Sequence, residues 1–209
     1  MTRAWWLLIA GCGRIGFVPV TGDGIVGAGD GGTSDGVMGT AMLAPSSDTY
    51  IIQNSTVHNE TDIQLFIGRS AGGNAAVTLL QFDVSTIPAR ATVTSASLQL
   101  YELTSMGQGT LDISVERVTS AWDATAVLYS TRPTWDAAPL SQQTVALQTP
   151  GFTQWDVTAA VQQWVSGAAP NFGFVVEAPA APTGSMIQMA SLDHGTAAER
   201  PQLVVVNVQ

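Results

Sequence analysis

From residue 48 onward, hydrophobic and polar positions alternate with a period of two, which is typical of half-buried β-strands. The pattern is clearest where Leu111, Ile113 and Val115 alternate with polar side chains. Similar segments are rich in strand-favouring residues and are bounded by turn residues. They predict strands near residues 48–53, 62–68, 75–83, 92–102, 111–116, 143–147, 152–155, 172–178, 185–191 and 202–208.

One segment has the period of a helix instead. Its apolar residues recur at i, i+3, i+4, i+7 and i+8 and therefore share one face: Val157, Ala160, Val161, Trp164 and Val165. Asp156 is placed to cap the N-terminus, and Gly167 follows the end, where a left-handed residue closes a helix. A helix this short needs to dock on other elements. We expect Trp164 to be its core anchor rather than a platform for a ligand.

About ten strands that are separated by turns, together with one short helix, are typical of a two-sheet architecture. The predicted fold is therefore mainly β: a jelly-roll-like antiparallel β-sandwich of about ten strands, with one short helix near residues 156–166.

The first residues are typical of a secretion signal. Arg3 precedes the apolar run A-W-W-L-L-I-A at 4–10, and Ile9-Ala10-Gly11-Cys12 resembles the lipobox of bacterial lipoproteins. The glycines of G-C-G-R-I-G (11–16) match a dinucleotide-binding motif, but Pro19 and further glycines prevent the helix that this motif requires. A buried N-terminal strand is the alternative to a signal.

The signal interpretation divides the chain into three parts: a lipoprotein signal and lipobox region at 1–16, a Gly/Asp-rich flexible linker at 17–45, and a β-sandwich domain at 46–209. Lipidation is expected at Cys12, the one cysteine of the chain. Gly13 after it would suit sorting to the outer membrane. We therefore expect a secreted, extracytoplasmic protein that contacts the membrane through its lipid anchor only.

Composition excludes several classes of partner. The formal net charge is -9 and lysine is absent, so nucleic acid binding is not expected. Polyanionic glycans are disfavoured for the same reason, unless the arginines cluster. A single cysteine allows neither an intrachain disulfide nor a cysteine metal site. We expect no cofactor and no metal site, although structural calcium between loop carboxylates and carbonyls stays open.

The ordered motifs of residues 48–209 resemble the DNRLRE domain family, which is grouped with carbohydrate-binding module family 96. They are D-T-Y-I (48–51), I-G-R (67–69), T-L-L-Q-F-D-V-S-T-I-P (78–88), T-V-T-S-A-S-L-Q-L-Y (92–101), A-W-D (121–123), T-W-D-A-A-P (134–139), W-D-V-T-A-A-V-Q-Q-W (155–164), N-F-G-F (171–174) and R-P-Q-L-V-V (200–205). The D-V-T-x-x-V-x-x-W piece is also similar to TGF-β propeptides. The resemblance implies an extracytoplasmic jelly-roll sandwich. Some relatives bind acidic polysaccharide such as alginate.

Candidate carbohydrate-binding residues are Trp122, Tyr129 and Trp135, because they occupy the longest loop-like region, 119–142. Exposed aromatic rings stack on the C–H faces of sugars; the alternative role is to close one end of the sandwich. Neither His58 nor His194 lies in a nucleophile motif, so we expect no enzyme. The predicted function is a non-catalytic lipoprotein module that binds polysaccharide or another cell-envelope component. The alternative is a structural or protein-interaction module without sugar binding.

Overall fold

The computed structural model describes residues 37–209, so the predicted signal, Cys12 and most of the predicted linker lie outside the described residues. The chain contains the strands β1 (Met38–Leu43), β2 (Pro45–Ile52), β3 (Gln64–Arg69), β4 (Ala75–Phe82), β5 (Thr92–Met106), β6 (Thr110–Arg117), β7 (Ser141–Ala146), β8 (Gly151–Asp156), β9 (Phe174–Glu177), β10 (Met186–Ala190) and β11 (Gln202–Val208). The remaining elements are the helix α1 (Thr158–Val165) and two short 3₁₀ turns, η1 (Tyr129–Thr131) and η2 (Ala197–Glu199).

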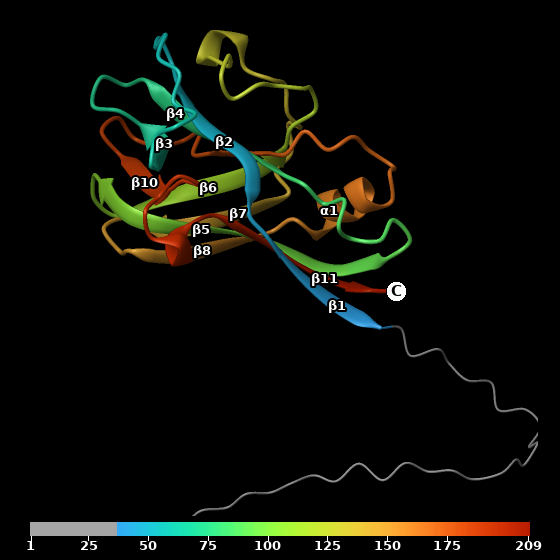
Figure 1. Ribbon diagram of the computed structural model, residues 1–209. Helices are drawn as coiled ribbons and strands as arrows, with labels where there is room; N and C mark the ends of the chain where they lie inside the picture. The colour runs from blue at the N-terminus through green and yellow to red at the C-terminus, as the bar shows by residue number, and fades with distance from the viewer. Residues whose placement is uncertain (1–36) are drawn as a thin grey trace, which may run out of the picture. The chain divides into compact units, whose positions relative to one another are not determined.

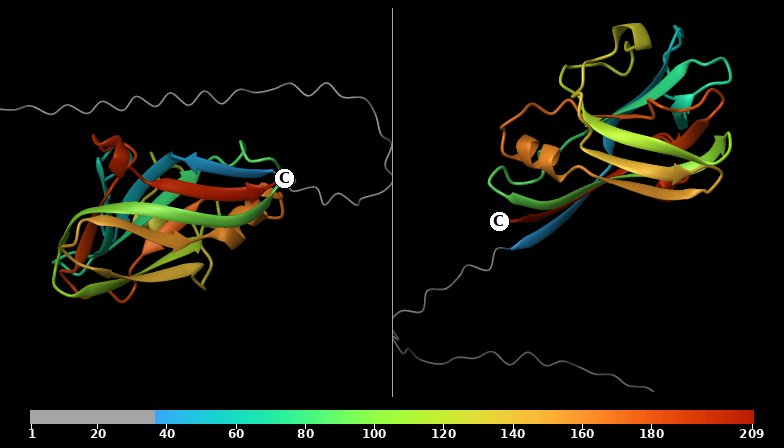
Figure 2. Two further views of the ribbon diagram at one scale, coloured as in Figure 1. Left: turned by 90° about the horizontal axis from the view of Figure 1, so that it is seen from below. Right: turned by 180° about the vertical axis from the view of Figure 1, so that it is seen from behind.

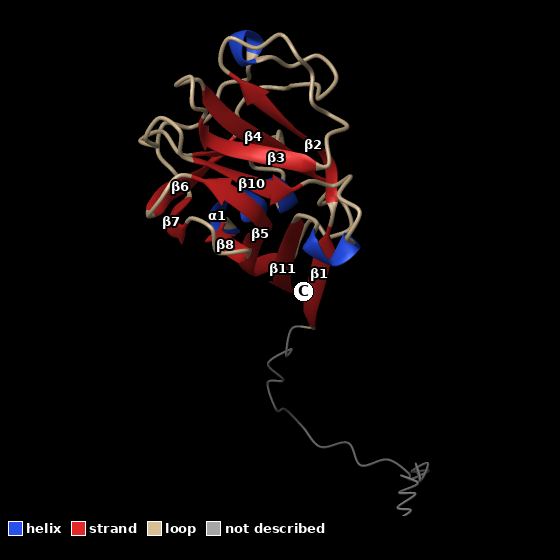
Figure 3. Ribbon diagram, turned by 90° about the vertical axis from the view of Figure 1, so that its left-hand side faces the viewer, coloured by secondary structure: helices blue, strands red, loops and turns tan. Residues whose placement is uncertain are grey.

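The strands form one antiparallel network in the order β1-β11-β5-β10-β3-β4-β9-β6-β7, with β2 added to β4 and β8 added to β5. The network curls into two layers, one around β11, β5 and β8 and the other around β4, β9 and β6 (Figure 1). The turn of the curl runs through β10, β3 and β4, which lie side by side (Figure 3). The predicted mainly β, jelly-roll-like sandwich with one short helix is confirmed.

One hydrophobic core lies between the two layers. Leu98 and Leu100 of β5 and Leu203 of β11 contribute to it from one side, and Leu80 and Phe174 contribute from the other. All five side chains are essentially inaccessible to solvent. The inward positions of the strands are therefore the apolar positions of the alternating pattern, as half-buried strands require.

Strand β1 lies inside the range that the sequence analysis assigned to a flexible linker. Met38 to Leu43 pair in register with Val208 to Leu203 of β11. The boundary between linker and domain at residue 46 is therefore wrong, and the domain begins at least eight residues earlier, with Met38. The residues M-G-T-A-M-L, with one glycine and one threonine among them, gave no clear strand pattern, because edge strands need little apolar surface.

The helix α1 connects β8 to β9 and so carries the chain from one layer to the other (Figure 1). It begins at Thr158, with Val157 as N-cap, two residues after the predicted start. Asp156 still caps it from one position earlier: its Oδ1 accepts the backbone N–H of Thr158 at 2.9 Å and the hydroxyl at 2.6 Å. The Thr158 Oγ1 in turn accepts the N–H of Ala96 at 2.8 Å, which ties the helix to β5.

Trp164 is buried and belongs to the core, where its ring lies 4.7 Å from that of Phe174 between centroids. The side chain is therefore not available as a platform for a ligand. Within residues 37–209, no helix is both long and apolar enough to cross a membrane.

Candidate functional site

The segment between β6 and β7, residues 118–140, covers the outer surface of the second layer (Figure 1). Ile51, Val77, Leu79 and Val175 point away from the main core and form a second, smaller cluster with residues of this segment. We call residues 118–140 the covering loop. It owes its position to this apolar surface, which would otherwise face water.

The covering loop carries all three predicted sugar-binding residues, and each is half-buried. Trp122, Tyr129 and Trp135 pack against the smaller cluster. The Trp122 Nε1 donates a hydrogen bond of 2.8 Å to the carbonyl of Phe172, which fixes the indole to the turn before β9. Each ring therefore contributes both to holding the loop and to its surface, so the two roles weighed from the sequence overlap.

Tyr129 and Trp135 come together around Arg132, an exposed residue that sequence reasoning did not select for the site. The Arg132 Cζ lies 4.4 Å from the centroid of the Tyr129 ring and 5.7 Å from that of Trp135. Its Nη1 also donates to the Tyr129 carbonyl at 2.9 Å. The guanidinium is thus held by two cation–π contacts and one hydrogen bond, with further donors free to reach a ligand.

Two hollows adjoin this group. A shallow cleft of about 420 Å³ is lined by Ser130, Arg132, Pro133, Thr134 and Trp135. A smaller hollow of about 160 Å³ includes Arg69, Tyr129 and Glu177 among its lining residues. Trp135 lines the larger cleft, Tyr129 lines the smaller hollow and Trp122 lines neither. The structure therefore brings two of the three predicted residues together around Arg132, but not into one cleft. We call the Tyr129–Arg132–Trp135 group and its cleft the loop site.

Two acidic residues lie under the covering loop, on the outer surface of the second layer. Ser114 of β6 pairs with Glu177 of β9, and Glu116 pairs with Val175, so the two glutamates are diagonal neighbours on one face. Burial raises the pKa of Glu116 to about 7; a hydrogen bond from Ser114 opposes the shift and the charge of Glu177 adds to it. Both carboxyl groups therefore hold protons more readily than exposed glutamates do.

Glu177 links this acidic pair to the loop site. Burial raises its pKa, whereas a hydrogen bond from the Trp135 side chain and the charge of Arg132 act against that shift. Leu111, Ile113 and Val115 face the core, so the alternation places Glu116 on the other face of β6. The sequence pattern therefore predicts that Glu116 is exposed. Glu116 is instead only 4% exposed, because the covering loop lies over that face.

The comparison with protein families decides what this sandwich is. The model of carbohydrate-binding module family 96 matches residues 39–207, from β1 to β11. The chain belongs to this family. The predicted resemblance to family 96 is thereby confirmed, while the DNRLRE name stays a prediction. A comparison with curated proteins finds no match.

The chain is thus a member of a carbohydrate-binding family, and the pair Glu116 and Glu177 differs in its arrangement from the carboxyl pair of a glycosidase. Glycosidases place two carboxyl groups on opposite sides of a substrate. Glu116 and Glu177 lie side by side on one sheet surface, and Glu116 is covered. Among residues 37–209, no group of three or more potential metal ligands is found.

The two histidines of the family 96 module lie in different surroundings. His194 has its Nε2 at 3.0 Å from Glu199 Oε2, and its carbonyl accepts the Arg200 Nε at 2.8 Å. These contacts brace the segment before β11. His58 is exposed in the loop between β2 and β3. In the described structure, neither imidazole side chain is hydrogen-bonded to the side chain of a serine or cysteine.

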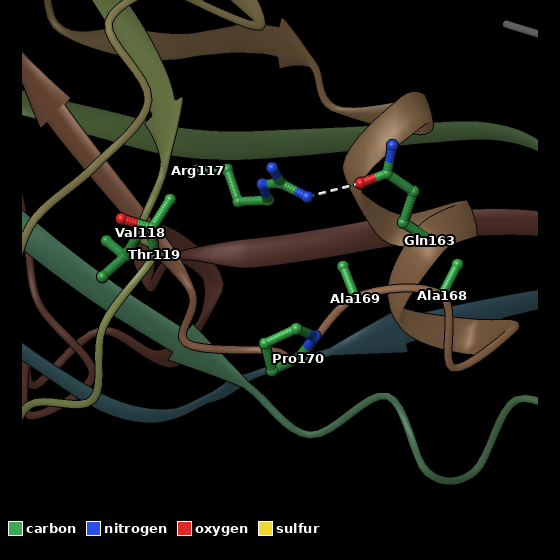
Figure 4. Close-up of a pocket in the computed structure, with 7 residues that line it drawn as sticks. All are labelled: Arg117, Val118, Thr119, Gln163, Ala168, Ala169 and Pro170. Carbon is green, nitrogen blue, oxygen red and sulfur yellow. Dashed lines mark hydrogen bonds between the residues drawn. The ribbon is translucent and has the colours of Figure 1, made fainter.

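A second cleft of the module, of about 400 Å³, lies between β6 and the segment after α1 (Figure 4). Arg117 points across it and donates from Nη1 to Gln163, while its Nε lies 3.0 Å from Asp136. Ala168, Ala169 and Pro170 line the other side, and no aromatic ring is among the lining residues. Arg117 has its charge matched by Asp136, so this cleft fits a structural role that joins β6, α1 and the covering loop.

Proposed function

We propose that this family 96 module is a non-catalytic carbohydrate-binding module that holds its ligand at the loop site. The observation that carries the proposal is the grouping of Tyr129, Arg132 and Trp135 beside an open cleft. The family is defined by carbohydrate binding, and this cleft offers the chemistry that sugars need.

The loop site combines the two kinds of contact that a sugar ring uses. Half-buried aromatic rings offer an apolar face to sugar C–H groups at little cost in conformational freedom. The Arg132 guanidinium supplies directed N–H donors for hydroxyl or carboxylate oxygens. The cleft of about 420 Å³ has the size of a small-ligand site, so it accommodates a short segment of a polysaccharide rather than a long stretch.

Binding assays on variants test the proposal directly. Arg132→Ala and Trp135→Ala should each weaken binding to the preferred glycan about tenfold, because each removes a ligand contact of about 1.4 kcal/mol. Affinity electrophoresis in gels that contain plant, algal or cell-wall polysaccharides measures the change. Arg90→Ala is the matched control, because Arg90 is exposed outside the covering loop.

Arg132 is exposed, but its guanidinium also donates a hydrogen bond to the Tyr129 carbonyl within the covering loop. Thermal unfolding of Arg132→Ala therefore separates the loss of a ligand contact from a change in the loop. Trp135 also packs in the smaller cluster, so Trp135→Ala is accompanied by a thermal unfolding measurement. Unchanged binding in the folded Arg132→Ala and Trp135→Ala variants would remove the loop site from the proposal.

We further propose that the module works outside the cytoplasm, tethered by a lipid at Cys12 and directed to the outer membrane. The supporting features are Arg3, the apolar run at 4–10 and the lipobox-like residues that end at Cys12. A lipid anchor leaves the sandwich free to meet polysaccharide or another component of the cell envelope.

A further inference from the structure

The outer surface of the first layer is uncovered in the described structure. Strands β1, β11, β5 and β8 lie side by side there, and no other described segment crosses in front of them (Figure 2, left). This differs from the second layer, whose outer surface is protected by the covering loop. We call the exposed surface of β11, β5 and β8 the open face.

Three glutamines form a row across the open face. Gln202 of β11 pairs with Gln99 of β5, and Gln99 pairs with Gln154 of β8. Directly paired residues of antiparallel strands point to the same face. Their chain neighbours Leu98 and Trp155 are buried in the core, so the three amide side chains point outward.

An aromatic pair adjoins this glutamine row. Tyr101 of β5 pairs with Phe152 of β8, and their rings meet edge to face with centroids 5.1 Å apart. Phe152 is 44% exposed, which is unusual for so large an apolar side chain. Tyr101 holds the Phe152 ring in place, so the open face presents a supported aromatic surface two residues from the glutamines.

The open face carries almost no charge. Outward positions of β11 and β5 hold glutamine, valine, serine, tyrosine and leucine, and β8 adds Phe152, Gln154 and Asp156. The one carboxylate among them, Asp156, already accepts two hydrogen bonds from Thr158. In a chain of net charge -9, an uncharged surface of this extent favours a neutral ligand, because an ionic one would lose hydration without gaining a counter-charge.

Two shallow hollows adjoin the row on its β8 side. One, of about 340 Å³, is lined by Ser97, Gln154 and Asp156 among others. The second, also about 340 Å³, lies along the seam between β7 and β8 and includes Phe152 and Thr153. The hollows extend the polar and aromatic surface beyond β8, which gives an elongated track rather than a closed pocket.

We propose that the open face binds a neutral, extended polysaccharide chain that runs across β11, β5 and β8. Neighbouring strands are about 4.8 Å apart, close to the length that one sugar residue adds to an extended chain. Each glutamine amide can then donate to one sugar hydroxyl and accept from another. A sugar ring lies on Phe152, whose apolar surface is otherwise exposed to water.

This surface is separate from the loop site, although it rests on the same premise that the module binds carbohydrate. The loop site presents a guanidinium in a compact cleft, whereas the open face presents uncharged amides along a track. The two surfaces share no residue, so variants can separate them. The module would then hold one polysaccharide at two places or two different polysaccharides at once.

Affinity electrophoresis with soluble hydroxyethyl cellulose, xyloglucan and galactomannan as neutral probes, and polygalacturonate as the acidic probe, tests the proposal. Phe152→Ala should raise the dissociation constant for the preferred neutral polymer about tenfold, through loss of the stacking surface. Gln154→Ala should raise it by a smaller factor, because only one amide is lost. Val57→Ala and Gln108→Ala are matched controls: both side chains are exposed outside the open face.

Three outcomes would overturn the proposal. The first is that neutral polymers fail to retard the chain at all, with or without retardation by polygalacturonate. The second is that Phe152→Ala and Gln154→Ala bind neutral polymers as the parent does while Arg132→Ala binds weakly, which leaves the loop site as the binding surface. The third is self-association in sedimentation experiments that Phe152→Ala abolishes, which would place a second copy of the chain on the face.

Discussion

Two tryptophans only nine positions apart contribute to the core in different ways. Trp155 is fully buried, and its Nε1 donates a hydrogen bond of 3.0 Å to the Ile113 carbonyl, from β8 to β6. Trp164 packs on Phe174, and its Nε1 is buried with no partner in the described structure. One indole therefore fixes the distance between layers, and the other only fills space.

This difference predicts unequal costs for the same substitution. Trp155→Phe should lower the free energy of unfolding by about 2–3 kcal/mol, because it leaves a cavity and a buried carbonyl without its donor. Trp164→Phe should cost about 1 kcal/mol less, since it also removes an unsatisfied N–H. Urea denaturation of both variants measures the two values. Equal costs, or a larger cost at Trp164, would contradict the assignment.

At the scale of elements, the short turn N-F-G-F before β9 joins three parts of the sandwich. The Asn171 Nδ2 donates to the Phe82 carbonyl at 2.7 Å, and its Oδ1 accepts the Gly173 N–H at 3.0 Å. The Phe172 carbonyl accepts the indole of Trp122 from the covering loop. The turn therefore holds β4, β9 and the covering loop together, and this is the structural role of the N-F-G-F motif.

Gly173 is the residue of this turn that tolerates substitution least. Its φ is +83°, and an added Cβ would lie 2.1 Å from the Leu80 carbonyl oxygen. Gly109 is a matched control, because its φ is also +83° but nothing lies within 4 Å of its Cβ position. Gly109→Ala should cost about 1 kcal/mol for the left-handed backbone alone. Gly173→Ala should cost at least about 3 kcal/mol in the free energy of unfolding, because β4 and β9 must also separate.

Thermal and chemical unfolding of the two alanine variants checks this difference. The proposed tie between the turn and the covering loop adds a second readout, since strain at Gly173 should also weaken the Trp122 contact and alter tryptophan fluorescence. Equal stability of the two variants would mean that β4 and β9 adapt to the extra methyl group.

At the scale of the whole molecule, the proposed lipid anchor determines where the sandwich works. Cys12→Ser removes the thiol that a lipoprotein signal needs, so we expect the variant to lose the mass of its lipid and to leave the membrane fraction. Mass spectrometry and membrane partition of chain expressed in a bacterium measure both effects. If mass and partition are the same for both proteins, the signal interpretation is wrong.

The order of strands and loops could be predicted largely from the sequence, because the period of two reports which residues face a core. The prediction failed at β1, whose residues M-G-T-A-M-L carry no strong alternation. An edge strand is specified by the partner it pairs with, here β11, and that partner lies far away in the chain. The candidate aromatic residues could be selected from the sequence because they lie in the longest region without the pattern of a strand, residues 119–142.

The sequence by itself therefore determined the fold class, the short helix and the membership in a carbohydrate-binding family, since these depend on local periodicity and on ordered motifs. Only the tertiary structure decided which side chains meet. Arg132 between Tyr129 and Trp135, the covered pair Glu116 and Glu177, and the row of glutamines all join residues from different strands or loop turns. The sequence predicts Trp164 as the anchor of a helix. The ring that it packs against, Phe174, belongs to β9, the strand that follows the helix. Such contacts depend on strand register and on which face a loop covers. The spacing of residues along the chain predicts neither of these.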